Sequence, residues 1–244
     1  MKDRFSNHSK EYATFRPGYP KGLYDFIFNH VNYFNCAWDA GTGNGQVAAD
    51  LASRFRRVLA TDISVRQLDQ ARRLTNIDYS VAGEVTVFPN RTTDLITVGQ
   101  AIHWFDRDNF YKEVKRVAKP GSLVAVWGYG LLSISPEIDP LLEHFYREVV
   151  GPYWDPERKL IDERYQTISF PFDEIKTPAF RFSVQWSLKE LQGYLETWSS
   201  VRKYMQINNT NPVDDFVGLI RSSWSNEKVA ANFPLFLRLG RVNN

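Results

Sequence analysis

Residues 38–47 have the sequence Trp38-Asp39-Ala40-Gly41-Thr42-Gly43-Asn44-Gly45-Gln46-Val47, and residues 58–63 continue as Val58-Leu59-Ala60-Thr61-Asp62-Ile63. This pattern predicts a strand, a tight glycine turn, a helix and a second strand that ends in an acid, which is the βαβ unit of nucleotide-binding sheets. Gly41 lets the chain leave the strand sharply, and Gly43 removes a side chain where a ligand would touch the backbone. Asp62 is placed to accept hydrogen bonds from both hydroxyls of a ribose.

The spacing of the glycines narrows the choice of ligand. It is G-x-G-x-G, whereas a helix N-terminus that holds a pyrophosphate usually follows G-x-G-x-x-G. Asp39, just before the glycines, is unfavourable beside a diphosphate and favourable beside a positive charge. S-adenosylmethionine (SAM) offers a ribose for Asp62, and a sulfonium and an ammonium for Asp39. A nicotinamide-dependent oxidoreductase, which would share Asp62 but not this spacing, stays open as an alternative, as does a SAM-binding protein without activity.

The composition is typical of a globular enzyme. The 244 residues suffice for one large α/β domain, and a formal net charge of +2 offers no basic surface to a nucleic acid. The single cysteine, Cys36, excludes an internal disulfide, and no apolar run approaches the roughly 20 residues of a membrane span. The histidines show no metal-ligand spacing. We therefore expect a cytoplasmic monomer or dimer with no metal, no membrane association and no nucleic-acid partner.

Strands and helices alternate along the chain, which predicts a parallel sheet. Strands are expected at residues 36–40, 57–62, 77–82, 93–99, 122–128, 181–186 and 233–239. Helices are expected to begin near residues 20, 46, 64, 107, 138, 187 and 211. Residues 1–244 should form a single domain, in which residues 1–34 are an N-terminal helical cap and residues 131–178 an inserted lid segment.

Further motifs match those of one enzyme family in the same order. They are residues 11–20 (EYATFRPGYP), 93–106 (TDLITVGQAIHWFD), 112–121 (KEVKRVAKPG) and 196–200 (ETWSS). Together with the glycine turn, they resemble the class I SAM-dependent methyltransferases, in particular small-molecule enzymes of the trans-aconitate methyltransferase group. The resemblance implies an α/β, Rossmann-like, mostly parallel sheet of seven strands in the order 3-2-1-4-5-7-6, with the last strand antiparallel and a helical cap. One departure lies at residues 82–89, where the family's proline is displaced.

The resemblance places the cofactor SAM along the carboxyl ends of the strands. The expected contacts are Tyr12, Arg16, Asp39, Gly41 and Gly43 at the methionine end, Asp62 and Ile63 at the ribose and adenine, Gly83 and Glu84 at the adenine, and Gln100 at the end of the fourth strand. Arg16 is the candidate partner of the SAM carboxylate, because a guanidinium and a carboxylate can pair through two hydrogen bonds.

His103, Trp104 and Trp198 are expected to face the methyl acceptor. Transfer from a sulfonium is an in-line displacement, which requires the acceptor at about 3–3.5 Å from the methyl group with water excluded. His103 could remove a proton from a hydroxyl or amine, whereas a carboxylate acceptor would need only a cationic partner. A structural role for His103 competes with this catalytic hypothesis. The predicted function is methyl transfer from SAM to a small organic acceptor, at an oxygen, a nitrogen or a carboxylate.

Overall fold

The computed structural model describes residues 15–243, which contain one eight-stranded sheet with helices around it. The strands are β1 Cys36–Ala40, β2 Arg57–Asp62, β3 Ile77–Val81, β4 Thr93–Gly99, β5 Ala118–Tyr129, β6 Asp173–Ile175, β7 Phe180–Trp186 and β8 Val229–Arg241. Their order is β3-β2-β1-β4-β5-β8-β6, and β7 also pairs with β8. The first five strands are parallel, and β8 runs antiparallel to β5, β6 and β7. The predicted strand order and antiparallel last strand are confirmed.

The edge of the sheet around β8 differs from the prediction. Residues 235–241 of β8 pair with β5, while residues 229–235 pair with β7, so that one long strand serves two neighbours. Strand β6 adds to the same end of β8 and was not predicted, because a strand of three residues leaves no alternation in the sequence. Strand β5 also begins at Ala118 rather than at residue 122, with a bulge in its pairing with β4.

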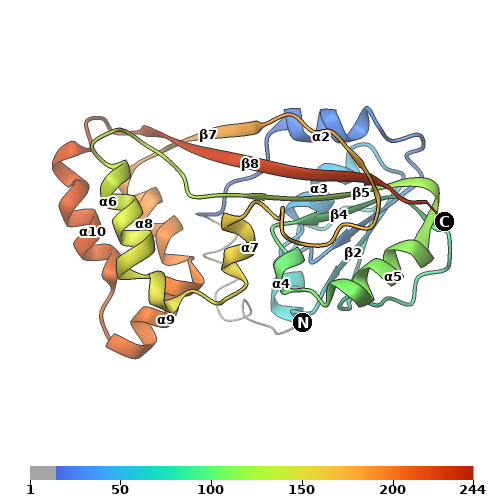
Figure 1. Cartoon of the computed structure of the whole chain (residues 1–244), viewed down its shortest axis with the longest axis horizontal. Coiled ribbons are helices and arrows are strands. Elements are labelled where there is room, and N and C mark those ends of the chain that lie inside the picture. The colour runs from blue at the N-terminus through green and yellow to red at the C-terminus, as the bar shows by residue number, and fades with distance from the viewer. Residues whose placement is uncertain (1–14, 244) are drawn as a thin grey trace.

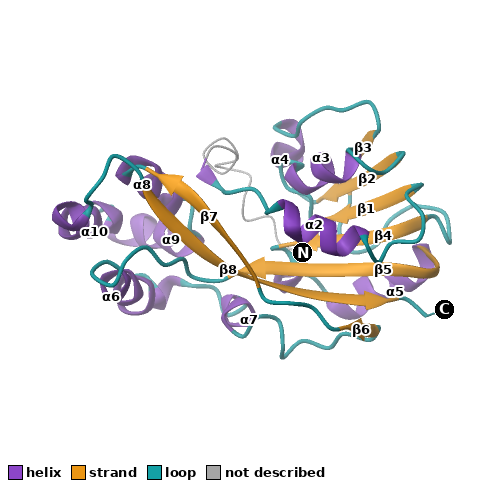
Figure 2. Ribbon diagram, turned by 90° about the horizontal axis from the view of Figure 1, so that it is seen from above, coloured by secondary structure: helices purple, strands orange, loops and turns teal. Residues whose placement is uncertain are grey.

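Helices cover both faces of the parallel strands (Figures 1 and 2). On one face lie α2 Lys21–Phe28 and α3 Gln46–Ala52, and on the other lies α5 Arg107–Val117, while α4 Val65–Asp69 follows β2. The core residues of β5 alternate between the two faces, with Leu123, Ala125 and Trp127 toward α2 and α3, and Val124 and Val126 toward α5. Both faces of the sheet are therefore buried, as a parallel sheet requires.

A second group of helices lies beside the sheet, at the left of Figure 1. It consists of α6 Asp139–His144, α8 Leu188–Glu196, α9 Ser199–Asn208 and α10 Pro212–Ile220, and we call it the helical lobe. The β7–β8 ribbon extends from the sheet into this lobe, and α7 Arg158–Asp162 lies between the lobe and the sheet (Figures 1 and 2). The lobe has its own apolar cluster, built around residues such as Leu142, Leu195 and Phe216.

Local sequence signals explain where the helices of the lobe begin and end. The expected capping box before α8 is present, because the Ser187 side chain and the Glu190 side chain each bond the other's backbone N–H. Asn211 caps α10, with Pro212 in its first turn. The helix predicted from residue 138 is found as α6 followed by a π-helical turn at residues 145–149.

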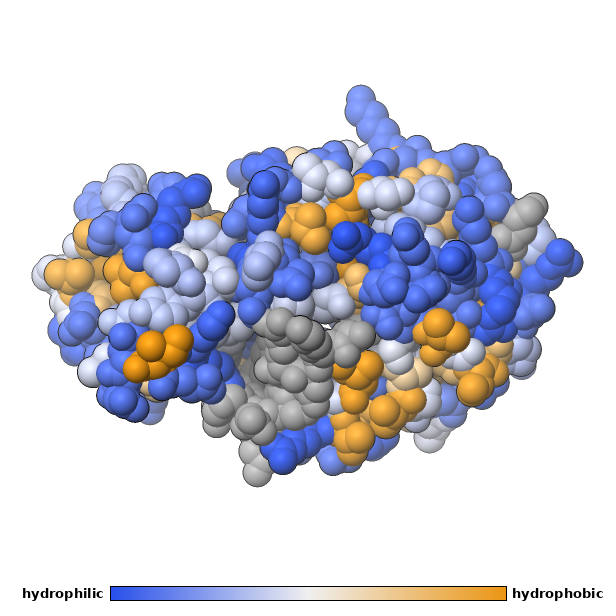
Figure 3. Space-filling view, turned by 60° about the horizontal axis from the view of Figure 1, so that its bottom comes forward, coloured by the Kyte–Doolittle hydropathy of each residue, from blue (hydrophilic) through white to orange (hydrophobic). Residues whose placement is uncertain are grey.

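Apolar residues are scattered on the one face of the described residues that Figure 3 shows. On the face in Figure 3, hydrophilic residues predominate and hydrophobic residues form small separate groups. Within residues 15–243, no helix has the length and apolarity needed to cross a bilayer. In the same part of the chain, no three or more His, Cys, Asp or Glu side chains are grouped to hold a metal ion.

Candidate active site

The glycine turn between β1 and α3 has the backbone that its sequence predicted. Gly41, Gly43 and Gly45 have φ angles of 68°, 56° and 80°, in the left-handed region that favours glycine. A Cβ at Gly41 would lie 2.8 Å from the Cβ of Ala101, and one at Gly45 would collide with the Tyr79 hydroxyl. A Cβ at Gly43 would meet nothing within 4 Å. Two of the glycines therefore allow close packing, whereas Gly43 borders open space where a ligand can approach the backbone.

Asp39 is buried beneath this turn. Its two carboxylate oxygens accept hydrogen bonds from the hydroxyls of Thr42, at 2.5 Å, and Thr97, at 2.8 Å. Burial raises the pKa of Asp39 to about 7, although both hydroxyl bonds act in the opposite direction. The carboxylate therefore shapes the turn directly, and in its ionised form it contributes negative charge below the open side of Gly43.

Asp62, at the end of β2, closes the turn from the other side. Its carboxylate accepts hydrogen bonds from the backbone N–H of Gly43, at 2.9 Å, and of Ser64, at 2.8 Å. Ile63 follows, and a Cβ built on Gly83 would lie 3.6 Å from the Ile63 side chain. The residues predicted for ribose and adenine thus lie together, in chain order, along the carboxyl ends of β1, β2 and β3. This fits a ligand that extends from Gly43 past Asp62 to Gly83.

Glu84 and Gln100 make bonds within the protein. The Glu84 carboxylate accepts a hydrogen bond from the backbone N–H of Asp106, at 2.9 Å, which ties the loop after β3 to the start of α5. Gln100 has a φ of 54°, and its side chain accepts a hydrogen bond from the Tyr129 backbone N–H at 2.8 Å. A non-glycine residue in the left-handed region is uncommon and costs about 1 kcal/mol or more, so Gln100 is held there by its surroundings.

Arg16 enters the site from the N-terminal side, whereas Tyr12 lies outside the described residues. The Arg16 guanidinium donates to the Tyr129 hydroxyl at 3.0 Å and to the Thr197 carbonyl at 3.3 Å, and it lies over the Tyr194 ring. It is thus placed between the end of β5 and the helical lobe.

A pocket opens where the sheet meets the helical lobe. Its walls include Arg16, Gln100, His103 and Trp104 on the side of the sheet, and Trp154, Asp155, Arg158 and Ser199 from the chain at and before α7 and from α9. The cavity itself is small, with a volume of about 40 Å³. Trp198 lies behind this wall, packed on the rings of Tyr146 and Trp154 at centroid distances of 5.6 and 5.5 Å. The residues predicted for the acceptor therefore gather at one place, with Trp198 as support.

His103 is a buried, uncharged member of the pocket wall. Its Nδ1 lies 2.8 Å from the Tyr165 hydroxyl, and its ring packs against Trp104. Burial, assisted by the positive charge of Arg158, lowers the pKa of His103 to about 3. A ring with this pKa is a weak base at neutral pH. His103 is therefore better suited to hydrogen bonding than to removing a proton.

Sequence reasoning missed several residues of the site. Arg158 and Tyr165 belong to no motif, and only the aromatic clustering and the expected lid directed attention to their region. Ser199 lies in the motif at residues 196–200, but no role was predicted for it. Arg158 donates to the Tyr146 hydroxyl at 2.7 Å and lies over the Trp154 ring at 4.6 Å. Such a contact between a cation and an aromatic ring is not visible in sequence spacing.

Comparisons with known proteins agree with this geometry. Residues 38–126 match the family model described as a methyltransferase domain. A Dictyostelium discoideum protein whose name describes it as a methyltransferase is 30% identical, over 98% of this chain and 95% of its own length. A solved structure described as a type II methyltransferase, from Anaeromyxobacter dehalogenans, is 34% identical with a TM-score of 0.87, covering 94% of this chain and 99% of the other. An uncharacterized methyltransferase of Schizosaccharomyces pombe is 24% identical, over 82% of this chain and 80% of its own.

These matches agree with the strand order, the glycine turn and the acid at the end of β2. They decide against the nicotinamide-dependent oxidoreductase that the sequence had left open as an alternative, because all of them are to methyltransferases. The chain belongs to the class I SAM-dependent methyltransferases.

Proposed function

We propose that this methyltransferase binds SAM along the glycine turn and transfers its methyl group to a small carboxylic acid. The methionine end would lie beside Gly41 and Gly43, the ribose on Asp62, and the adenine between Ile63 and Gly83. The open space at Gly43 and the ionisable Asp39 beneath it support this placement. Gln100 and Arg16 line the pocket in which the acceptor would lie.

The observation that carries the choice of acceptor is the chemistry of the pocket. Two guanidinium groups, of Arg16 and Arg158, line the pocket together with the Asp155 carboxylate, and Arg158 also lies 3.7 Å from the Asp162 carboxylate. A guanidinium holds a carboxylate through two parallel hydrogen bonds. The rings of Trp104 and Trp154 and these few charged groups line a small cleft, which suits a small molecule rather than a macromolecule.

The state of His103 favours the same class of acceptor. A hydroxyl or ammonium acceptor must lose a proton, and His103, with a pKa of about 3, is poorly suited to take it. A carboxylate is already a nucleophile at neutral pH. SAM supplies an electrophilic methyl on sulfur, so that an oxygen–carbon bond forms, the sulfur–carbon bond breaks, and a methyl ester and S-adenosylhomocysteine result. The protein's task is then to orient two ligands and exclude water.

The test is a screen of small metabolites with SAM, with methylated products detected by mass spectrometry. We expect the products to be methyl esters, which mild alkali hydrolyses back to the acid. Products that resist alkali, such as methylamines or ethers, would contradict the carboxylate assignment. Binding of SAM without any methylated product would favour a SAM-binding protein without activity.

A substitution at Arg158 tests the pocket itself. Arg158→Gln should raise the KM for the acid about tenfold or more, because a charge-assisted pair is lost, while the KM for SAM stays the same. Arg158→Lys keeps the charge and should recover part of the loss. Lys159→Gln is a matched control, because Lys159 follows Arg158 in the chain and its side chain is 78% exposed. An unchanged KM in Arg158→Gln would place the acceptor elsewhere.

A further inference from the structure

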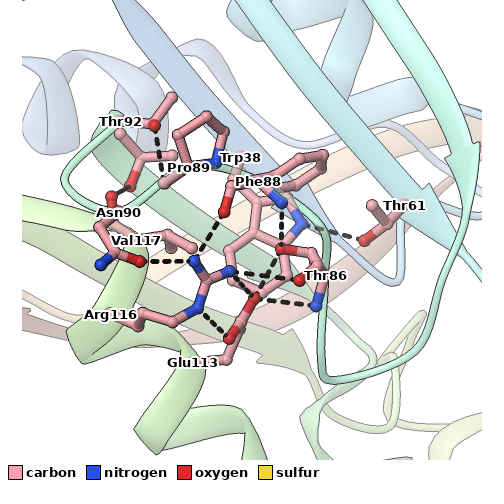
Figure 4. A network of polar contacts seen from close by, with 11 residues as sticks. Trp38, Thr61, Thr86, Phe88, Pro89, Asn90, Thr92, Glu113, Arg116 and Val117 are labelled. Atoms are coloured by element: carbon pink, nitrogen blue, oxygen red, sulfur yellow. Dashed lines mark hydrogen bonds and ion pairs between the residues drawn. The ribbon is translucent and has the colours of Figure 1, made fainter.

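The segment from residues 85 to 90, which follows the adenine-side loop, has neither helix nor strand, yet it is fixed in place by two charged side chains of α5 (Figure 4). Glu113 accepts hydrogen bonds from the backbone N–H of Thr86, at 2.8 Å, and from its hydroxyl, at 2.6 Å. Only 4% of Glu113 is exposed, so the carboxylate is bonded to groups of the loop in place of water.

Arg116 completes the attachment with all of its donors. Its Nε and one Nη2 hydrogen pair with the two carboxylate oxygens of Glu113 at 2.8 and 2.6 Å. The other three hydrogens go to the loop, namely to the Phe88 carbonyl at 2.6 Å, the Asn90 side chain at 2.8 Å and the Thr86 carbonyl at 3.2 Å. A guanidinium has five N–H donors in a rigid plane, and here each has a partner. We call Glu113 and Arg116 the loop clamp.

Hydrophobic burial holds this segment at Phe88 alone among its three large apolar side chains. Val87 is 99% exposed and Val85 is 63% exposed. Phe88 packs edge-on against Trp38, with ring centroids 5.9 Å apart. The shape of the segment therefore depends on the loop clamp.

Stability alone is also a weak reason for such a pair. Removing a carboxylate and a guanidinium from water costs free energy that their attraction often only offsets, so apolar residues could stabilise α5 equally well. What a fully bonded pair adds is a defined position for the groups attached to it.

The position that the clamp defines adjoins the proposed adenine site. Thr86 follows two residues after Glu84, whose carboxylate is bonded to the backbone N–H of Asp106, the N-cap residue of α5. Helix α5 thus holds the loop at Glu84 and again at residues 86–90. Gly83 stands directly before the first attachment and beside Ile63.

We propose that Glu113 and Arg116 are positioning residues for recognition of the adenine base. The clamp keeps the polar groups of residues 82–84 at a fixed distance from the base edge, where they distinguish the adenine amino group from a carbonyl oxygen. A loop free to move by an ångström would accept either base, because it could reorient its donors and acceptors. This inference rests on the proposed placement of adenine beside Ile63 and Gly83.

The test compares two ligands that differ only at that edge, S-adenosylhomocysteine and S-inosylhomocysteine, by titration calorimetry on the full chain. We expect the unmodified protein to prefer the adenosine compound by at least about tenfold, because a mismatched hydrogen-bond partner is left unpaired. Glu113→Gln and Arg116→Lys should lower this preference to about twofold or less. Glu143→Gln, which removes an exposed pair with Arg147 one helical turn away, is the matched control and should keep the full preference.

The ratio of the two affinities separates positioning from folding. If the clamp had a purely structural role, its loss would lower the affinity for both ligands equally. An unchanged ratio of affinities in both clamp variants would therefore overturn the inference. If either variant unfolds, Thr86→Val removes the hydroxyl bond to Glu113 and the longer bond that this hydroxyl accepts from the Phe88 backbone N–H. It keeps the backbone bond to Glu113, and it must lower the ratio for the inference to stand. Failure of the unmodified protein to bind S-adenosylhomocysteine would instead overturn the proposed function.

Discussion

Two carboxylates at the glycine turn do different work because their surroundings differ. Burial raises the pKa of Asp39 to about 7, although two hydroxyls that donate to it act in the opposite direction, whereas Asp62 lies at the strand end and accepts backbone N–H groups. Both residues were predicted from the glycine pattern alone, since the acid positions are fixed by the βαβ turn. Tyr165, by contrast, could not be predicted, because its partner His103 is 62 residues away in the chain. No local pattern specifies a contact of that separation.

Replacing Asp62 tests the cofactor placement. Asp62→Ala should lower SAM affinity at least about tenfold, because the ribose hydroxyls lose a charged acceptor and each such hydrogen bond contributes about 1.5–3 kcal/mol. Titration calorimetry measures the loss, and circular dichroism checks the fold. Asp69→Ala, an exposed acid in α4, is the control. Unchanged affinity would place the ribose elsewhere.

The raised pKa of Asp39 predicts a pH dependence of SAM binding. Burial raises this pKa to about 7, so that raising the pH from 6 to 7.5 converts most of the carboxyl to its ionised form. The ionised form attracts the cationic groups of SAM, and affinity should therefore rise about fivefold over this range. His103, with a pKa of about 3, stays uncharged throughout and does not contribute.

The control for this pH dependence is Asp39→Asn. It keeps the shape of the side chain and its capacity to bond Thr42 and Thr97, but it cannot ionise. Its affinity for SAM should be lower and nearly independent of pH between 6 and 7.5. A profile in Asp39→Asn that still rises as in the unmodified protein would assign the titration to another group.

At the scale of elements, an irregular turn after α7 brings Tyr165 to His103. Arg164 and Tyr165 have φ angles of 54° and 57°, which is unfavourable for two successive non-glycine residues. Arg238 of β8 holds this turn by donating to the carbonyls of Tyr165 and Ile168 at 3.0 and 2.8 Å. Its other donors pair with both oxygens of Glu174 in β6. The short strand that the sequence did not reveal thus anchors a turn of the pocket.

Substituting Arg238 should therefore cost stability. Arg238→Met keeps the length of the side chain but leaves two carbonyls without donors, and the free energy of unfolding should fall by about 2–4 kcal/mol. Urea titration measures it. Arg181→Met, an exposed arginine in the neighbouring strand β7, should change it by less than about 0.5 kcal/mol. A loss as small as that of the control would mean that the turn is held by other contacts.

Elements with a strong local signal were predicted well, and those set by tertiary contacts were not. The helix starts at Ser187 and Asn211 follow from capping chemistry that is complete within four residues. The early start of β5 at Ala118 could not be predicted, because Pro120 and Gly121 are typical of a turn and only the pairing with β4 extends the strand. The three residues of β6 likewise become a strand only because β8 is beside them.

Across the whole molecule, the pocket depends on two parts that are far apart in the sequence. His103 and Trp104 come from the 3-10 helical turn that follows β4, while Trp154 and Arg158 come from the chain at and before α7 and Ser199 from the helical lobe. Strand β8 joins the two parts, since one half pairs with β7 beside the lobe and the other half with β5 in the sheet. If β8 detached when the lobe unfolded, the edge of β5 would be exposed.

We therefore expect the lobe and the sheet to unfold together. Leu195→Ala, at a fully buried position in α8, should lower the free energy of unfolding by about 2–5 kcal/mol, and Leu219→Ala, at a position 65% exposed on α10, should have little effect. Urea curves followed by tryptophan fluorescence and by far-UV circular dichroism should still coincide in Leu195→Ala. Two separate transitions would show that the lobe unfolds alone. The acceptor pocket would then be complete in only part of the population, and Leu195→Ala would weaken acceptor binding more than SAM binding.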